Sequence, residues 1–225
     1  MKISEDTMTI LKNFSSINSN LVIFPGNELK SVAPNLGIIS IATVSENFSE
    51  KVNIFDLSQF LNVCSMMKDP DFDFKDTHVI ISSGKSKVKY RYAAPELMTT
   101  LENNLKRNMK PLTFEFNFEL TPEMITGIMK SRSALMVSNM SIRSVGDRIV
   151  LAVHDKNDSS SNVYEVDLGD NQTKHEFSFN FDIVNSLKII PGNYLVELSP
   201  KISKFTNKDI DVTYFISVES DSFWK

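Results

Sequence analysis

The residue types that most often carry out chemistry are few in this chain and lie far apart. Its three histidines are His78, His154 and His175, and they fall in separate segments. No His-x-x-x-His or Cys-x-x-Cys pair occurs. Zinc sites are usually built from closely spaced nitrogen and sulfur ligands of this kind, so the sequence does not support a zinc centre.

The single cysteine, Cys64, shares one face of a predicted helix with Leu57, Phe60 and Leu61. A thiol on an apolar face is more typical of a buried packing residue than of a nucleophile. One cysteine cannot form a disulfide within the chain, which suits a reducing cytosol. We therefore interpret Cys64 as a structural residue.

Carboxylates and glycines are the remaining candidates for a site. The run from Asp69 to Asp76 concentrates aspartates, but it lacks the glycine and the terminal glutamate of a calcium loop, so a solvated turn is the favoured interpretation. The 7 glycines form no Gly-x-Gly-x-x-Gly, Walker or Gly-x-Ser-x-Gly motif. The sequence thus predicts a protein that is not an enzyme and needs no metal or other cofactor.

The remaining signal is electrostatic. Cations lie at or near each of four predicted helices: Lys2, Lys12, Lys68, Lys130, Arg132 and Lys188. They could be ordinary solvated charges on polar helix faces. Alternatively, the four helices share one side of the sheets and present these cations to phosphates. Lysine contacts phosphate without reading base sequence, and the nearby Glu5, Asp6 and Glu123 would keep such binding weak.

The elements that would position these side chains are mostly strands. Apolar and polar residues alternate over 112–120, 175–181, 37–44, 79–83, 88–92, 148–154, 194–198 and 212–218. This alternation predicts strands with one buried face. Helical spacing follows Ser4, Asp56, Thr121 with Pro122, and Asp182, each a residue that commonly begins a helix.

The order of the elements predicts an α+β protein with an internal repeat. A short strand, a helix and several strands follow one another four times, beginning at Met1, Val52, Leu112 and His175. Repeats of this length indicate a modular architecture. Two such units would form each half of the chain. Exposed strand edges could then pair between copies, and our candidates are 79–92 in the first half and 194–205 in the second.

The predicted domains are 1–93 and 112–225, joined by a connector over 94–111. The connector is rich in polar residues and contains two prolines, Pro95 and Pro111. Its apolar residues have helical spacing and could pack on a sheet: Leu97, Met98, Leu101 and Leu105.

The composition supports a folded domain protein. Of 225 residues, 41% are hydrophobic and 23% are charged, and the formal net charge is −4. We expect no signal peptide and no membrane span, because the start of the chain is polar and no apolar stretch is long enough to cross a bilayer. The acidic balance argues against a wholly basic nucleic-acid binder, although a ring needs basic residues only around its hole.

Several segments resemble the sliding clamps of T-even-type bacteriophages. The matching blocks are Met1-Lys-Ile-Ser-Glu-Asp-Thr7, Leu11-Lys-Asn-Phe14, Ile17-Asn-Ser19, Phe55-Asp-Leu-Ser-Gln-Phe-Leu61, Pro191-Gly-Asn-Tyr194 and Val218-Glu-Ser-Asp-Ser222. These blocks span nearly the whole chain. The first helix here, with Glu5 and Asp6 beside Lys12, is less basic than the resemblance leads one to expect.

The resemblance implies a two-domain DNA clamp fold with antiparallel sheets outside and four short helices lining a hole. It implies a head-to-tail homotrimer that encircles double-stranded DNA in the cytoplasm of an infected bacterial host. The implied partners are a clamp loader, the replicative DNA polymerase, which binds through a short hydrophobic peptide, and the late viral transcription machinery. In such a ring the helix cations would face DNA, and the apolar residues of the connector would border the peptide pocket.

Two other functions were weighed. A β-rich structural protein of the virion would also be acidic and poor in cysteine, but the regular strand–helix–strands order is unusual for that class. An enzyme with an unrecognised site is disfavoured by the scarce glycines and scattered histidines.

Overall fold

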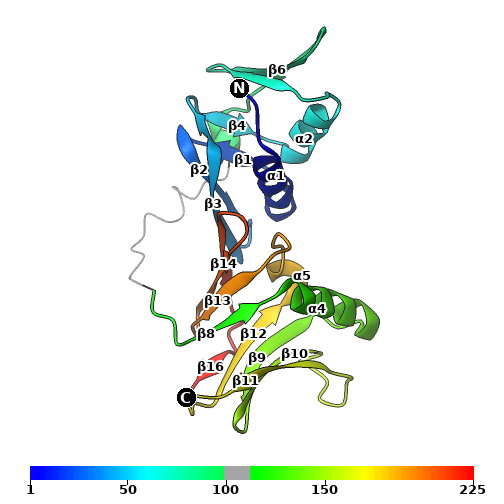
Figure 1. Cartoon of the computed structure of the whole chain (residues 1–225), viewed down its shortest axis with the longest axis vertical. Helices are drawn as coiled ribbons and strands as arrows, with labels where there is room; N and C mark the ends of the chain where they lie inside the picture. Colours follow the sequence, from blue (N-terminus) through cyan, green and yellow to red (C-terminus); the bar gives the residue numbers. More distant parts are fainter. Residues whose placement is uncertain (99–111) are drawn as a thin grey trace. The chain divides into compact units, whose positions relative to one another are not determined.

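The computed structural model describes residues 1–98 and 112–225, which form two compact units. Unit 1 is Met1–Lys110 with Ile210–Thr213, and unit 2 is Pro111–Asp209 with Tyr214–Lys225. Both units combine antiparallel strands with short helices (Figure 1), as predicted for an α+β protein.

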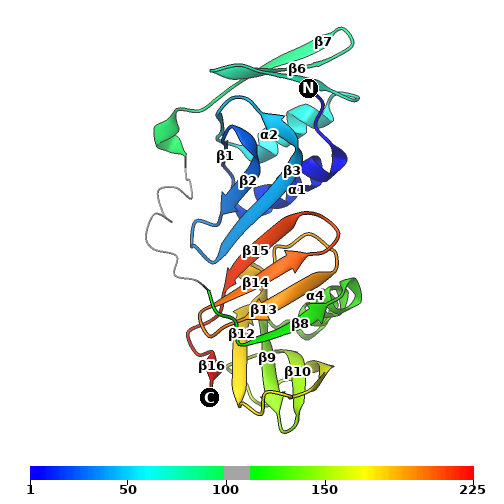
Figure 2. The same ribbon diagram turned by 60° about the vertical axis from the view of Figure 1, so that its left-hand side comes forward.

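The described part of unit 1 contains two α-helices and a 3-10 turn among its strands. In chain order they are α1 (Glu5–Ile17), β1 (Leu21–Ile23), β2 (Gly26–Val32), β3 (Ile38–Phe48), β4 (Val52–Ile54), α2 (Leu57–Ser65), β5 (Asp71–Phe74), β6 (His78–Ser83), β7 (Ser86–Arg91) and η1 (Pro95–Leu97). The strand β1 pairs with β4, β2 pairs with β3, and β5, β6 and β7 form a three-stranded sheet. Figure 2 shows β6 and β7 as a long hairpin.

Unit 2 is also built from strands and short helices. Its elements are β8 (Phe116–Leu120), α4 (Pro122–Leu135), β9 (Asn139–Val145), β10 (Arg148–His154), β11 (Tyr164–Asp170), β12 (Phe177–Asp182), α5 (Ile183–Ser186), β13 (Tyr194–Leu198), β14 (Ile202–Asn207), β15 (Val212–Ser217) and β16 (Phe223–Trp224). One sheet has the order β11-β10-β9-β12-β16. In the other, β13 lies between β14 and β8.

The predicted fourfold repeat is confirmed. The second, third and fourth repeats each consist of a strand, a helix and three strands, namely β4-α2-β5-β6-β7, β8-α4-β9-β10-β11 and β12-α5-β13-β14-β15. The first repeat is α1-β1-β2-β3. Its leading residues are not a regular strand, but Met1 exchanges main-chain hydrogen bonds of 2.6 and 2.8 Å with Phe72 of β5. Pairing is equivalent in the two units, since β1 bonds β4 as β9 bonds β12.

Side-chain caps explain where the helices begin. The hydroxyl of Ser4 accepts a hydrogen bond from the Thr7 amide of α1, Asp56 accepts from Gln59 of α2, and Thr121 accepts from Met124 of α4. The carboxylate of Asp182 accepts from Val184 and Asn185 of α5. Each cap satisfies an amide that has no partner within the helix, so all four predicted starts are correct.

The core lies between the helices and the apolar sheet faces. On β12, Phe177, Phe179 and Phe181 are almost fully buried, while the residues between them are partly exposed. On α1 the buried side chains are Thr7, Ile10, Leu11, Phe14 and Ile17. These patterns are the periods of two and 3.6 that the sequence displays.

Two local predictions were wrong. The strand expected over 112–120 begins only at Phe116, because the β13 ladder ends where Leu198 pairs with Phe116 and leaves the earlier residues without a partner strand. The aspartate-rich run is not simply a solvated turn, since Asp71–Phe74 forms β5. Its Phe72 is 3% exposed and packs near Phe60 of α2, which gives the segment a buried face.

Candidate functional site

The side chains that most often carry out chemistry are placed as follows. Cys64 is 2% exposed, and burial raises the pKa of its thiol to about 11, so it is not a thiolate at neutral pH. In residues 1–98 and 112–225, no three His, Cys, Asp or Glu side chains gather as a metal site would require. His78 lies in β6 and His154 in β10, as predicted, whereas His175 lies just before β12, which begins at Phe177.

Lys2 is already engaged with neighbouring carboxylates. Its Nζ lies 3.0 Å from a carboxylate oxygen of Asp69 and 3.4 Å from one of Asp71, and it also donates to the Asp69 carbonyl. The hydrogen bond to Asp69 is the main cause of its raised pKa. A cation with two carboxylates beside it attracts phosphate less than an isolated cation does.

The other predicted cations lie on or just after the helices. Lys12 is exposed on α1, Lys68 is exposed three residues beyond the end of α2, and Lys130 is exposed on α4. Arg132 and Lys188 are partly exposed, the first in the last turn of α4 and the second shortly after α5.

The solvent-facing sides of the helices carry little net charge. On α1, Glu5 and Asp6 in the first turn oppose Lys12, and α2 has no charged residue between its caps. On α4, Lys130 borders an open apolar groove of about 710 Å³ whose lining includes Pro122, Ile125, Met129 and Pro191. The helices therefore offer a mainly neutral polar and apolar surface with scattered cations.

The most concentrated positive charge lies elsewhere, on the edge strand β7. Lys87, Lys89 and Arg91 alternate with Val88 and Tyr90, so the three cations project from one face of the strand and are exposed. The alternation Lys-Val-Lys-Tyr-Arg was the signal for this surface, which the sequence analysis did not single out. We call these three residues the basic edge.

The cations of the basic edge lie close to His78, which pairs with Arg91 across the two strands. Partial desolvation lowers the pKa of His78, and the charges of Lys89, Arg91 and Lys75 lower it further. Among the described residues, β7 pairs only with β6. The hydrogen-bonding groups on the other side of β7 are therefore available to another strand.

The opposite charge lies on β11, which is the edge of the five-stranded sheet. Its carboxylates Glu165, Asp167 and Asp170 project away from the α4 side, and we call them the acidic edge. Two arginines lie beside them, Arg148 on the adjacent strand β10 and Arg143 on β9, one strand further. Arg143 Nη2 is 2.9 Å from Glu165, and Arg148 Nε is 3.1 Å from Asp167. The hydrogen bond from Arg148 lowers the pKa of Asp167, so this carboxylate is ionised at neutral pH.

The opposite face of this sheet packs on α4. Gly127 of α4 lies so close to Tyr164 of β11 that an added Cβ would be 2.4 Å from the Tyr164 hydroxyl oxygen. The ring of Tyr164 therefore packs directly on the backbone of α4 at Gly127.

Part of the predicted peptide pocket can be placed. Leu97 is 59% exposed, whereas Met98 is 8% exposed and belongs to the core of unit 1. Leu97 lines a groove of about 530 Å³ together with Phe55, Tyr90 and Tyr92. Leu101 and Leu105 lie outside the described residues.

The predicted edges at 79–92 and 194–205 have different outcomes. The first range contains β7, which is an edge as expected. The second was wrong, because β13 is bonded on both sides, to β14 and to β8. Among the described strands of unit 2, β11 is an edge strand that carries several carboxylates.

Comparisons with known proteins identify the class. A solved structure described as the C-terminal region of FEN-1 bound to A. fulgidus PCNA matches with a TM-score of 0.68, covering 96% of each chain at 11% identity. At this identity the likeness concerns the fold, and it establishes that the chain has the sliding-clamp fold.

The sequence comparisons are more specific. Residues 117–220 match the family model described as gp45 sliding clamp, C terminal. The sliding clamp of Vibrio phage KVP40 is 26% identical over 98% of this chain and 100% of its own length. That of Escherichia phage RB69 is 29% identical over 99% of this chain and 98% of its own. The predicted resemblance is confirmed: the chain is similar in sequence to sliding clamps of bacteriophages over nearly its whole length, and it has the sliding-clamp fold. In the described residues no helix is long and apolar enough to span a membrane.

Proposed function

We propose that this chain works as a sliding clamp, a non-enzymatic ring that encircles double-stranded DNA and tethers a replicative DNA polymerase to it. The observation that carries the proposal is the similarity to a phage sliding clamp over 98% of the chain. Tethering acts by raising the local concentration of the partner, because each rebinding becomes intramolecular. No catalytic group is needed for this role.

We propose that three copies close the ring head to tail, with the basic edge of one copy meeting the acidic edge of the next. The internal repeat supports this pairing. Within unit 1 the Thr43 amide of β3, the last strand of the first repeat, donates a hydrogen bond to the Asp211 carbonyl at 3.0 Å. The equivalent last strands of the second and third repeats are β7 and β11, and both lie at sheet edges.

Charge supports the same pairing. Lys87, Lys89 and Arg91 on β7 would lie next to the carboxylates of β11 in a continuous antiparallel sheet, and opposite charges on neighbouring strands stabilise such a pairing. A heterologous contact of this kind forms a ring when the rotation per subunit closes.

For DNA, we propose that the ring needs only weak contacts. Lys12, Lys68, Lys130, Arg132 and Lys188 remain the candidates for phosphate contact, with Lys2 contributing least because of Asp69 and Asp71. Scattered cations on mainly neutral helices give sequence-independent, salt-sensitive attraction. Such a surface lets a closed ring slide.

For partners, we propose that a short hydrophobic peptide of the polymerase docks at the groove bordered by Phe55 and Leu97, both more than half exposed. In the structurally similar A. fulgidus PCNA, the bound partner is the C-terminal region of FEN-1, which supports a peptide ligand for this fold. We also propose a clamp loader and the late transcription machinery in the host cytoplasm as partners. The domain limits 1–93 and 112–225 remain proposals.

Light scattering over a dilution series tests the ring. The wild-type chain should have a mass near three times 25.5 kDa, which falls only on dilution. Reversing the basic edge (Lys87→Glu, Lys89→Glu, Arg91→Glu) should give monomers, and so should reversing the acidic edge (Glu165→Lys, Asp167→Lys, Asp170→Lys). A chain with both edges reversed should form the trimer again, because its edges are complementary once more.

A matched control is Lys201→Glu, an exposed charge in a turn away from both strands. A strictly monomeric wild type, or a trimer unaffected by either reversal, contradicts the proposed interface. The function is tested separately by retention on circular but not linear DNA. Equal retention on both would contradict topological binding even if the trimer forms.

A further inference from the structure

The edge of β12 is covered by the chain's own last residues. We call residues 219–225 the strap. Its two-residue strand β16 pairs with β12 in antiparallel register, Trp224 opposite Phe177 and Phe223 opposite Ser178. Beyond this pair, the main chains of Lys225 and Glu176 exchange hydrogen bonds of 2.9 and 3.2 Å.

An aromatic cluster holds the strap at this end. The Trp224 ring stacks on His175 with centroids 4.8 Å apart and on Phe177 at 5.0 Å, and it lies 6.0 Å from Phe179. Phe177 and Phe179 are buried, whereas Phe223 and Trp224 are only partly buried. The β12 side of the contact is therefore a fixed part of the core, and the strap side is a surface layer.

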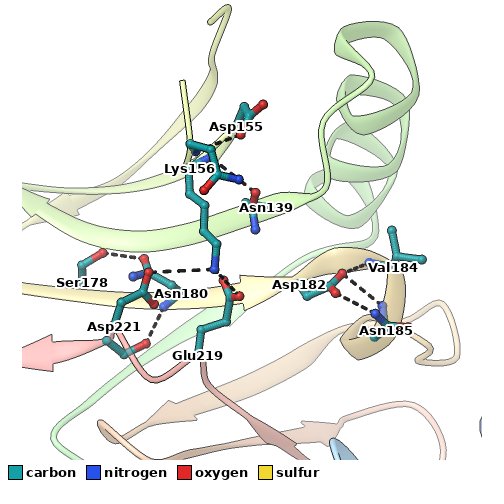
Figure 3. Close-up of polar contacts among 12 residues, drawn as sticks. Asn139, Asp155, Lys156, Ser178, Asn180, Asp182, Val184, Asn185, Glu219 and Asp221 are labelled. Atoms are coloured by element: carbon teal, nitrogen blue, oxygen red, sulfur yellow. Dashed lines mark hydrogen bonds and ion pairs between the residues drawn. The ribbon is translucent and has the colours of Figure 1, made fainter. Parts of the chain in front are cut away.

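A polar anchor holds the other end of the strap (Figure 3). Lys156, from the loop after β10, places Nζ 2.5 Å from a carboxylate oxygen of Glu219 and 4.0 Å from one of Asp221. Hydrogen bonding to Glu219 is the main cause of the raised pKa of Lys156. These residues line an open polar cavity of about 330 Å³ on the face of the sheet.

Between its two ends the strap fits β12 imperfectly. The Glu219 amide donates to the Asn180 carbonyl at 2.8 Å, but the Asn180 amide donates to the side chain of Ser222 at 2.9 Å instead of to a carbonyl of the strap. Glu219 Oε2 is buried, and among the described residues it has no hydrogen-bond partner. A regular strand could bond more of the β12 edge through its main chain than the strap does.

We propose that the β12 edge is a strand-addition site for an extended peptide of another protein, and that the strap occupies this site until the peptide displaces it. The strap defines the chemistry of the ligand. The ligand should carry an acidic residue that reaches Lys156. Four residues later it should carry two adjacent aromatic residues, the second of which stacks on His175 and Phe177. This surface belongs to unit 2 and goes beyond the proposed function.

The chain provides its own reporter, because Trp224 is its only tryptophan. The probe is a synthetic peptide with the sequence of residues 217–225 in which phenylalanine replaces tryptophan, so that all tryptophan emission comes from the protein. As the peptide displaces the strap, Trp224 should become exposed, and its emission should shift to longer wavelength and become more accessible to acrylamide. A control peptide with alanine at both aromatic positions should have no effect.

Two variants sharpen the test. Glu219→Gln removes the closer of the two ion pairs that Lys156 forms with the strap and leaves the one at 4.0 Å to Asp221. The peptide should then bind roughly two- to fivefold more tightly, as expected for a partly exposed ion pair. Lys156→Ala should weaken binding relative to Glu219→Gln, because the acidic residue of the peptide loses its partner. No emission change in either the wild type or Glu219→Gln at saturating peptide would overturn the proposal and make the strap a permanent part of the sheet.

Discussion

The start of α1 depends on one buried carboxylate from β3. Glu46 is 8% exposed, and its two oxygens accept hydrogen bonds from the Ser4 amide and, at 2.5 Å, from the Thr7 hydroxyl. Both donors lie at the first turn of α1, where amides have no partner within the helix. The helix that carries Lys12 is thus tied to the sheet by Glu46.

We predict that Glu46→Gln lowers the free energy of unfolding by about 2 kcal/mol. Glutamine has the same shape but only one acceptor oxygen, so one of the two donors loses its bond and the other loses the charge that strengthens it. A hydrogen bond to a charged group contributes roughly 1.5–3 kcal/mol, and a buried donor without a partner adds a penalty of its own. Removing both bonds with Glu46→Ala should cost about 3 kcal/mol or more.

Urea unfolding followed by circular dichroism measures this difference. The matched control is Glu28→Gln, where the same chemical change removes an exposed ion pair with Lys30 and should alter stability by less than about 0.5 kcal/mol. If Glu46→Gln proves no more destabilising than Glu28→Gln, the carboxylate of Glu46 does not hold α1 in place. A Glu46–Thr7 double-mutant cycle would isolate the contribution of the hydroxyl.

The same carboxylate predicts a pH dependence. Burial opposes ionisation of Glu46, but the hydrogen bonds from Thr7 and Ser4 outweigh it, so the pKa is lowered from its ordinary 4.5. A lowered folded-state pKa gives stability that is present above pH 4.5 and is lost as the pH falls through the folded value. Unfolding experiments across this range should show wild type and Glu46→Gln converging in acid. A constant difference between them would contradict the assignment.

Two further predictions concern the candidate surfaces. Replacing Lys12, Lys130 and Lys188 together by alanine should weaken retention on circular DNA and reduce the salt dependence of that retention, without unfolding the chain. Unchanged retention across a salt titration would show that these cations do not face DNA. Gly127→Ala would force the Tyr164 hydroxyl away from α4 and should destabilise the chain by about 1–2 kcal/mol, although alanine normally stabilises a helix. Adding Tyr164→Phe should recover part of the loss, and a stabilised Gly127→Ala chain would refute the close contact.

The sequence was sufficient for features that depend on neighbouring residues. The four helix starts followed from Ser4, Asp56, Thr121 and Asp182, because a cap and the amide it binds lie within three residues of each other. The repeat could be recognised for the same reason, since each unit is a local succession of alternating and helical patterns. The burial of Cys64 followed from its helical neighbours.

Features that depend on distant partners could not be read in this way. The ends of β8 are decided by where β13 stops, and β13 lies more than seventy residues along the chain, at Tyr194–Leu198. The strand β5 looked like a turn because its aspartates dominate the composition, whereas Phe72 and its contact with α2 decide its structure. The role of Lys2 likewise depends on Asp69 and Asp71, which only the fold brings beside it.

The distribution of charge then links the fold to the proposed function. The chain is acidic overall, with a net charge of −4, and its helices carry almost balanced charges. In the described residues, charges gather on the two sheet edges, with cations on β7 and, on β11, carboxylates that Arg143 and Arg148 partly neutralise. If these edges close the ring, most of the favourable electrostatic interaction acts between subunits and little of it acts on DNA. Rising salt should then open the ring before it changes how fast the closed ring slides, since screening weakens exposed charge pairs. A ring whose stability is insensitive to salt would require its closure to come from apolar contacts instead.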